Sequence, residues 1–241
     1  MKDWLSSAFE SGRILPEDAE GFLLGRGMRE STIQYLEVSQ WKTPKEPCPD
    51  PIFVEKYRGG EYLEDRLVFP AFSPRGSLIG FEARSWDGTK RITDYRLPDS
   101  NWNPFFLGLT PETMQKIWEG GNVWIVEGIF DRVLERVIPE TDTVLATVRA
   151  KLSDTHVEFL RRNLRRGARV YMVYDNDETG QKQTHGWVDS KTGKQKWGAI
   201  SLLNRVAVPC QAVSFRGGKD PGEIWEQYGT PGLHKAFAHV L

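Results

Sequence analysis

The chain has 241 residues, of which 39% are hydrophobic and 27% are charged, and its formal net charge is −1. These values are typical of a soluble globular protein and leave room for two domains of ordinary size. The near-zero charge gives no global basic signature of nucleic-acid binding. No apolar run approaches the roughly 20 residues of a membrane-spanning helix, and the N-terminal residues lack the apolar core of a secretory signal. We therefore expect a cytoplasmic protein with no membrane contact.

The cysteine content limits the disulfides and metal sites that the chain can form. Cys48 and Cys210 are the only cysteines, and neither has a nearby partner in a CxxC motif. A disulfide framework and a zinc site built from cysteines alone are therefore excluded. The histidines have no spacing typical of metal ligands and lie at His156, His185, His234 and His239. We expect no zinc.

The N-terminal part, residues 1–115, is predicted to be a small α+β subdomain. Helices are expected at Pro16–Gly25 and Arg29–Leu36, where apolar residues recur at helical spacing. Two apolar segments rich in β-forming residues follow at Arg66–Phe72 and Leu78–Arg84. The turn sequence Ser-Pro-Arg-Gly separates them, so together they predict a β-hairpin.

The C-terminal part, residues 116–241, alternates predicted strands with predicted helices. The strands are expected at Val123–Val126, Thr143–Thr147, Val170–Tyr174 and Gln211–Phe215. The helices are expected at Ile129–Val137, at 154–166 with Ser153 as N-cap and Gly167 as stop, and at Ala199–Val206. This alternation predicts an α/β domain with a mostly parallel sheet that helices cover on both faces.

One polar segment interrupts this rhythm. The stretch from His185 to Trp197, with Gly193 in its turn, predicts a hairpin inserted at about 181–198. Its two tryptophans, Trp187 and Trp197, are expected to pack against each other across the hairpin. The alternative is that they offer a stacking surface to single-stranded DNA.

Acidic side chains follow three of the four predicted strands. Glu127 directly follows the first strand, Asp175 and Asp177 follow the third, and Asp220 comes shortly after the fourth. Because parallel strands end at the same edge of a sheet, we expect these carboxylates to lie close together. Oxygen-rich clusters suit hard divalent cations. The sequence therefore predicts a site for Mg²⁺ or Mn²⁺ at this edge.

Two other motifs share part of this local sequence. An EF-hand loop that begins at Asp175 would need a bidentate Glu at its twelfth position, which is Gly186 here, so that interpretation fails. An apolar strand followed by Asp-x-Asp-x-Thr also resembles the nucleophile motif of haloacid-dehalogenase-type phosphatases. That motif opens its domain, and too few residues follow Gly180 to build the rest. It stays a minor alternative.

Three segments around the acids resemble the Toprim motifs of bacterial DnaG-type primases: Val126-Glu-Gly-Ile-Phe-Asp131, Tyr174-Asp-Asn-Asp-Glu-Thr-Gly180 and Gly218-Lys-Asp-Pro221. The N-terminal half agrees independently. Phe22–Ile33 is similar to the helical entry of the primase polymerase core, and Arg66–Arg84 is similar to the hairpin that precedes Toprim in that family. The resemblance spans roughly residues 15–230.

The resemblance implies template-directed synthesis of short RNA primers from ribonucleoside triphosphates on single-stranded DNA, by two-metal nucleotidyl transfer. The catalytic residues it implies are Glu127, Asp175 and Asp177, and the metal ligands are these three with Asp131 and Asp220. For Asp131 the alternative is an exposed acid in the first turn of a helix. The residues that it implies for binding nucleotide and template are Arg84, Lys90 and Arg91.

The chain also departs from the family pattern. A Gly-Thr pair usually follows the second Toprim strand, where this chain has Thr147-Val-Arg149-Ala150, and Gly222 stands where a second acid is often found. We expect the preceding zinc-binding module and the following helicase-binding region to be absent, as in a small phage-type enzyme. A separate zinc-binding subunit or a replicative helicase is therefore an expected partner. A Toprim nuclease and a non-catalytic nucleic-acid-binding replisome subunit stay open as alternatives.

Overall fold

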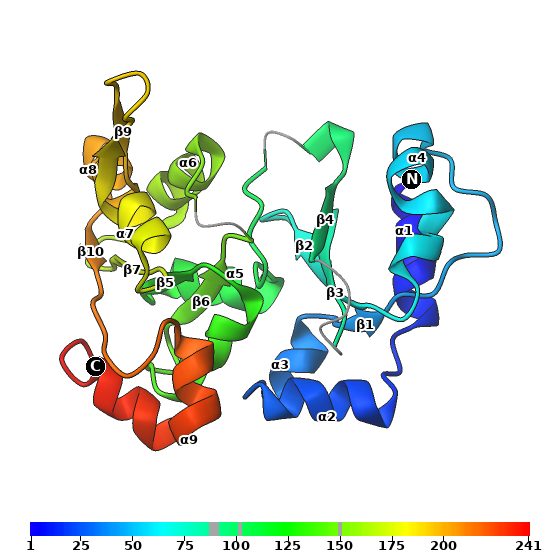
Figure 1. The fold of residues 1–241 in the computed structure, drawn as a ribbon, viewed down its shortest axis with the longest axis horizontal. Helices are drawn as coiled ribbons and strands as arrows, with labels where there is room; N and C mark the ends of the chain where they lie inside the picture. The colour runs from blue at the N-terminus through cyan, green and yellow to red at the C-terminus, as the bar shows by residue number, and fades with distance from the viewer. Residues whose placement is uncertain (87–91, 101–102, 149–150) are drawn as a thin grey trace.

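A computed structural model describes residues 1–86, 92–100, 103–148 and 151–241, and it shows two sheets side by side with helices around them (Figure 1). The N-terminal sheet is antiparallel, with the strand order β1-β2-β3-β4. Its strands are β1 (Ser39–Gln40), β2 (Leu67–Phe72), β3 (Leu78–Arg84) and β4 (Thr93–Arg96). Its helical elements are α1 (Lys2–Ser11), α2 (Glu17–Gly25), α3 (Glu30–Tyr35), α4 (Pro51–Tyr57), η1 (Arg58–Leu63) and η2 (Pro98–Ser100).

The C-terminal sheet is parallel throughout, with the order β10-β7-β5-β6. Its strands are β5 (Val123–Val126), β6 (Thr143–Ala146), β7 (Val170–Val173) and β10 (Cys210–Ala212). The helical elements around it are α5 (Pro111–Glu119), η3 (Ile129–Arg136), α6 (Asp154–Asn163), α7 (Glu178–His185), α8 (Ala199–Arg205) and α9 (Pro221–Phe237). The predicted α/β class and parallel sheet are confirmed.

Several predicted boundaries are wrong. Helix α6 has the predicted Ser153 cap but ends at Asn163, because Leu164 takes an extended conformation. Strand β10 ends at Ala212 instead of Phe215. The predictions also missed α1, α4, α5, α7 and α9. The sequence carried a signal for α4, since Asp50 accepts hydrogen bonds from the first turn and Pro51 begins the helix.

The predicted hairpin is present as β8 (Gly186–Val188) paired with β9 (Gln195–Trp197), and the segment just before it belongs to α7. Its register contradicts one expectation. Trp197 lies opposite Gly186, and Trp187 lies opposite Lys196. Because neighbouring pairs along a ribbon point to opposite faces, the two indoles do not face each other.

One apolar core connects the two sheets. Leu107 forms isolated bridges both to Ala71 of β2 and to Ala146 of β6. The largest buried cluster accordingly contains Phe69 from the N-terminal sheet together with Trp124 from the parallel sheet. This shared core fixes the carboxyl edge of the parallel sheet against the N-terminal half. Among the described helices, none is both long and apolar enough to span a bilayer.

Candidate active site

The predicted acids are positioned by strand ends and helix starts. Glu127 follows the last residue of β5, and Asp175 lies two residues beyond the end of β7, where it is buried. Asp177 caps α7 by accepting a hydrogen bond from the Gly180 amide at 2.9 Å. Asp220 caps α9 in the same way, accepting from the Glu223 amide at 2.7 Å. The carboxylates of Asp177 and Asp220 therefore also cap the first turns of α7 and α9.

A lysine ammonium lies between two of these carboxylates. The Nζ of Lys219 is 3.0 Å from Asp175 Oδ2 and 3.3 Å from Asp177 Oδ2, and the two aspartates raise the pKa of Lys219. Burial nevertheless raises the pKa of Asp175 above its ordinary value despite the lysine. The backbone supports this arrangement, because the Asn176 amide donates to the Lys219 carbonyl at 2.7 Å. The loops after β7 and β10 are thus held together.

Glu127 is the least satisfied acid of the group. Burial, and then the negative charges of Asp175 and Asp177, raise the pKa of Glu127 to about 7. Its Oε2 is buried and has no hydrogen-bond partner among the described residues. A buried carboxylate oxygen without a donor is costly. It indicates a position that a cation or a proton would stabilise.

Asp131 is buried close to Asp220 and Asp175. Its Oδ2 accepts from the Gly128 amide at 3.0 Å, and its Oδ1 accepts from the Gly222 amide at 3.2 Å. Burial, and then the charge of Asp220, raise the pKa of Asp131. The alternative, an exposed acid in the first turn of a helix, is therefore wrong, because the side chain is buried and joins the loop after β5 to the start of α9. Its role as a metal ligand stays a prediction.

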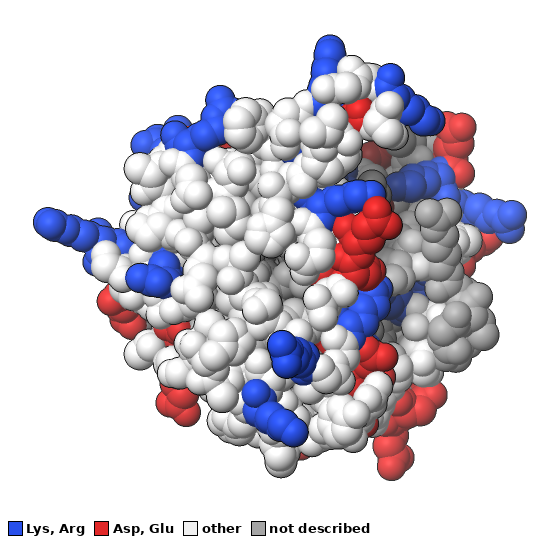
Figure 2. All heavy atoms as spheres, turned by 60° about the vertical axis from the view of Figure 1, so that its left-hand side comes forward, with Lys and Arg blue, Asp and Glu red and all other residues white. Residues whose placement is uncertain are grey.

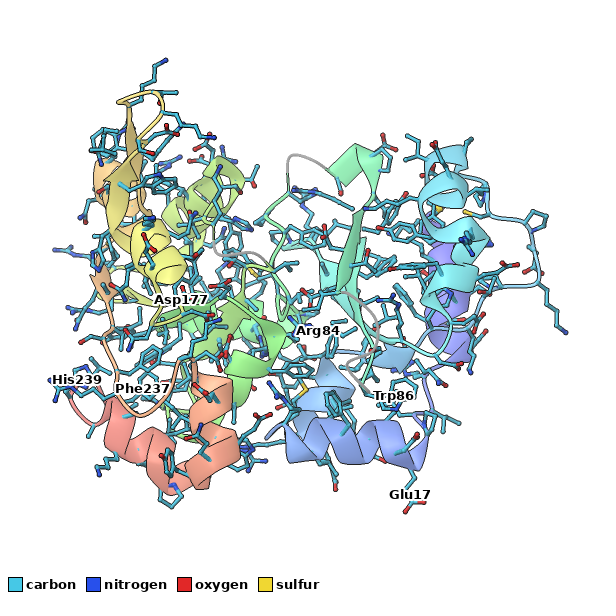
Figure 3. The ribbon with its side chains drawn as sticks, in the orientation of Figure 1. Glu17, Arg84, Trp86, Asp177, Phe237 and His239 are labelled. Carbon is cyan, nitrogen blue, oxygen red and sulfur yellow. The ribbon has the colours of Figure 1, made fainter. Side chains whose placement is uncertain are left out.

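Two arginines approach the acids from the N-terminal half. The guanidinium carbons of Arg84 and Arg26 lie 4.9 Å and 4.7 Å from the centre of the Phe130 ring. Arg84 pairs with the buried Glu82, and its Nη2 would be only 3.6 Å from a Cβ on Gly128, next to Glu127. Figure 3 shows Arg84 between the two halves, with Asp177 at the start of α7.

Arg26 was missed by the sequence analysis. Its Nη2 would be 3.5 Å from a Cβ on Gly222, close to Asp220 and Asp131, whose charges partly offset the lowering of the Arg26 pKa by burial. It also pairs with Glu226 of α9. The sequence carried one indication of this role. Arg26 lies between the two predicted helices Pro16–Gly25 and Arg29–Leu36, so its side chain belongs to the face of neither helix.

The remaining predicted positions cannot be placed. Lys90, Arg91 and Arg149 lie outside the described residues. Within the described residues, no three carboxylate, imidazole or thiol groups already form a ligand set for a metal ion. The negative charges of Asp175 and Asp177 help to raise the pKa of Glu127, but the ammonium of Lys219 lies between the two aspartates. The predicted ligand roles of Glu127, Asp175, Asp177 and Asp220 therefore stay proposals.

Comparison with known proteins finds DNA primases among the curated relatives. No family model matches the chain. The DNA primase of Lactococcus lactis is 27% identical over 179 residues, which are 70% of this chain and 24% of the relative. That of Aquifex aeolicus is 29% identical over 174 residues, which are 70% of this chain and 31% of the relative. The chain thus spans about a quarter to a third of these curated relatives.

Solved structures agree over nearly the whole chain. The zinc-binding and RNA polymerase domains of Aquifex aeolicus primase superpose with a TM-score of 0.67 at 21% identity, over 97% of this chain and 60% of that one. A DnaG primase catalytic domain bound to single-stranded DNA gives 0.62 at 17% identity, over 98% and 80%. The fold is that of the DnaG-type primase catalytic core. The acidic edge of the parallel sheet is thus the Toprim part of a primase-core fold, as the sequence predicted.

Proposed function

We propose that this chain is the catalytic core of a DNA primase, which synthesises short RNA primers on single-stranded DNA during replication. Similarity to DNA primases over 70% of the chain supports this proposal. The observation that carries it is the set of carboxylates at one edge of the primase-core sheet, with the Oε2 of Glu127 buried and unpaired among the described residues. This function also places the chain in the cytoplasm, or in the host cytoplasm for a phage enzyme.

The acidic edge fits a divalent cation by its chemistry. Carboxylate oxygens are the preferred ligands of Mg²⁺ and Mn²⁺, and the raised pKa of Glu127 reflects negative charge that a cation would offset. Asp175, Asp177, Asp220 and Glu127 would hold the metal, with Asp131 beneath them. Bound there, divalent ions supply the charge stabilisation and substrate orientation that nucleotidyl transfer needs. Lys219 would then turn from the aspartates toward the phosphates.

The N-terminal side of the site would bind the nucleotide. Arg84 and Arg26 are oriented by Glu82, Glu226 and the ring of Phe130, so their guanidinium groups are held at the edge of the acidic cluster. Planar guanidinium groups bind phosphate through paired hydrogen bonds. We place the triphosphate here, with Lys90 and Arg91 beside it. The ribonucleotides would thus be held between the two halves of the molecule.

The template partner follows from the relatives. One similar structure is a DnaG catalytic domain bound to single-stranded DNA. We extend this partner to the present chain, together with a separate zinc-binding subunit or a replicative helicase for the remaining steps. Template binding next to the arginines would bring the growing primer to the acidic edge.

The test is incubation of the protein with single-stranded template, labelled ribonucleotides and Mg²⁺. We expect short labelled oligomers, and at least about a hundredfold loss of them in Asp175→Asn, the range for loss of one electrostatic stabiliser. Arg26→Gln should raise the nucleotide concentration needed for half-maximal synthesis. Asp154→Asn, on the exposed first turn of α6, is the matched control and should change neither quantity.

Other outcomes point to other functions. Degradation of the template, lost in Asp175→Asn, would assign a nuclease. Template binding without either product would assign a non-catalytic replisome subunit. Synthesis that survives Asp175→Asn would contradict the proposed role of the acidic edge.

A further inference from the structure

The β8–β9 hairpin is a side branch of the fold between α7 and α8. A Cβ built on Gly198 would lie 2.3 Å from the Gly186 nitrogen and 2.5 Å from the Thr184 carbonyl oxygen. The backbone therefore leaves α7 and returns to α8 at nearly the same point, and only glycine permits this approach. The ribbon in between stands away from the two main sheets, as Figure 1 shows. It can be removed without cutting a core strand.

The tip of the hairpin is ordered by its single acid. Asp189 Oδ1 accepts hydrogen bonds from the Lys191 and Thr192 amides at 3.0 Å and 2.9 Å. The Gly193 amide donates to the Asp189 carbonyl at 2.8 Å, with Gly193 at a φ of 64°. The Asp189 carboxylate is thus engaged by the backbone. The turn is pre-organised, so the lysines around it project from a defined support.

The exposed charge of the hairpin is positive. Lys191, Lys194 and Lys196 are exposed, and Asp189 is the one acid between Gly186 and Trp197. None of the three lysines forms an ion pair with any residue that the structure describes. In Figure 2, lysine and arginine side chains project at the top of the molecule, where Figure 1 places the ribbon. This local excess contrasts with the net charge of −1 of the whole chain.

An aromatic ring lies on one face of the same ribbon. Trp197 is 54% exposed, and its cross-strand neighbour Gly186 has no side chain to cover it. The guanidinium of Arg205, from α8, lies 5.3 Å from the indole centre. Val188, 61% exposed, lies on the same face. The guanidinium lies over one face of this exposed indole, and the opposite face is where an unpaired base would stack.

We propose that the β8–β9 hairpin, together with Arg205, is a second binding site for single-stranded nucleic acid, separate from the acidic edge. Trp197 would stack on an unpaired base, and Lys191, Lys194 and Lys196 would neutralise phosphates. Duplex bases are stacked on one another, so the indole selects single strands. Three exposed lysines with a single acid, Asp189, near them favour a polyanion over a protein surface. The inference rests on the proposed function only in taking the bound strand to be the template.

The test measures binding directly, by the fluorescence anisotropy of a labelled oligothymidylate with the full chain over a salt series. Deletion of residues 187–197, which joins Gly186 to Gly198, should raise the dissociation constant at least about fivefold, the lower end for loss of one stacked base. Trp197→Ala, with the ribbon retained, should also raise it about fivefold, and the deletion, which removes the lysines as well, should raise it further. Equal affinity of wild type and both variants would overturn the proposal.

A charge variant tests the lysines separately. Lys191→Gln with Lys194→Gln should reduce the slope of log affinity against log salt by about 1.4, since each phosphate contact on a single strand contributes about 0.7. The matched control is Lys2→Gln with Lys45→Gln, two exposed lysines of the N-terminal half, which should leave the slope unchanged. Equal changes in the two double variants would show general attraction and contradict a site on the ribbon.

The proposed primase function and the proposed hairpin site can be refuted independently of each other. Asp175→Asn should abolish primer synthesis and leave the ribbon-dependent part of oligothymidylate binding intact. Ribbon-dependent binding by a wild-type protein that makes no primers would remove the proposed function and leave this site. If the deletion leaves DNA affinity unchanged but removes association with a purified replicative helicase, the ribbon is a protein-docking element and our proposal is wrong.

Discussion

At the scale of single residues, the acidic site consists of side chains with two tasks. Asp177 and Asp220 cap α7 and α9, while Asp131 accepts amide hydrogen bonds from two loops. Removing such a side chain would therefore disturb the structure as well as the charge. Asparagine is as good an N-cap as aspartate. At Asp177 and Asp220, substitution of Asp by Asn removes the charge and keeps the cap, which separates chemistry from folding. At Asp131 it would set an amide NH2 against one of the two backbone donors, so that position does not allow the separation.

Because His156 is buried, we expect the fold to lose stability in acid at a place away from the acidic site. His156 lies at the third position of α6, where its Nδ1 is 2.8 Å from the Ser153 hydroxyl, and burial lowers its pKa to about 4. Unfolding restores a higher pKa, so the unfolded state binds more protons between about pH 4 and 6.5. Stability from the neutral imidazole is complete above pH 6.5 and is lost as the pH falls to 4, by about 3 kcal/mol.

His156→Gln should remove this contribution, because glutamine at this position also completes a capping box. The raised pKa values of Glu127 and Asp131 act with the opposite sign in the same range, so the variant is compared with wild type at each pH, and the difference in free energy of unfolding should shift by about 3 kcal/mol in favour of the variant between pH 7 and pH 4. Urea unfolding at a series of pH values between 4 and 7 measures it. His234→Gln, at an exposed site in α9, serves as the control and should keep the wild-type pH profile. A profile in His156→Gln as steep as that of wild type would refute the assignment.

At the scale of elements, α7 is placed by the close approach of two backbones. The sequence analysis predicted no helix for the segment after Asp177. The structure continues it as a helix, and Gly180 is needed because a Cβ there would lie 2.0 Å from the Asp175 carbonyl oxygen. This contact holds the start of α7 against the end of β7. It fixes both aspartates at the same edge.

Glycine-to-alanine substitutions in two helices should therefore have opposite effects. Gly180→Ala forces the backbones apart and should lower the free energy of unfolding by about 1–3 kcal/mol. Gly21→Ala, in α2, has nothing within 4 Å of the new Cβ and should raise it by roughly 0.5–1 kcal/mol through helix propensity. Chemical denaturation of both variants measures the pair. A gain of stability in Gly180→Ala would contradict the close contact.

At the scale of the whole molecule, the two sheets depend on a common interior. Phe69 of β2 packs edge-on against Phe130, which follows β5. Tyr35 of α3 hydrogen-bonds Glu135 at 2.7 Å, and the wholly buried Arg132 pairs with the same two side chains. The division at residue 115 stays a prediction. The contacts across it lead us to expect that the halves unfold together.

Phe69→Ala tests this cooperativity. The ring is 1% exposed, so its loss should cost about 3–5 kcal/mol. Thermal unfolding followed by near-ultraviolet and far-ultraviolet circular dichroism should give one coincident transition in wild type and one at lower temperature in the variant. Ile52→Ala, at a 67% exposed position of the same half, should leave the transition unchanged. Two separated transitions in either protein would show independent halves.

Much of the fold could be predicted because its signals are local. The period of apolar residues gave α2 and α3, the hairpin β2–β3 and the parallel strands. Helix α1 was missed although Trp4 and Leu5 lie one turn from Ala8 and all three are buried. The indoles of the inserted hairpin were misplaced because a shift of one residue in register moves a side chain to the opposite face.

The sequence by itself determined which acids meet, because parallel strands end at one edge and Glu127, Asp175 and Asp220 each follow such a strand. Only the tertiary structure decided what surrounds them. The Lys219 ammonium between two aspartates, the two arginines on Phe130 and the buried position of Asp131 arise from contacts between separate elements. Local patterns record neither distance nor burial across the chain, whereas charge, pKa and ligand binding depend on both.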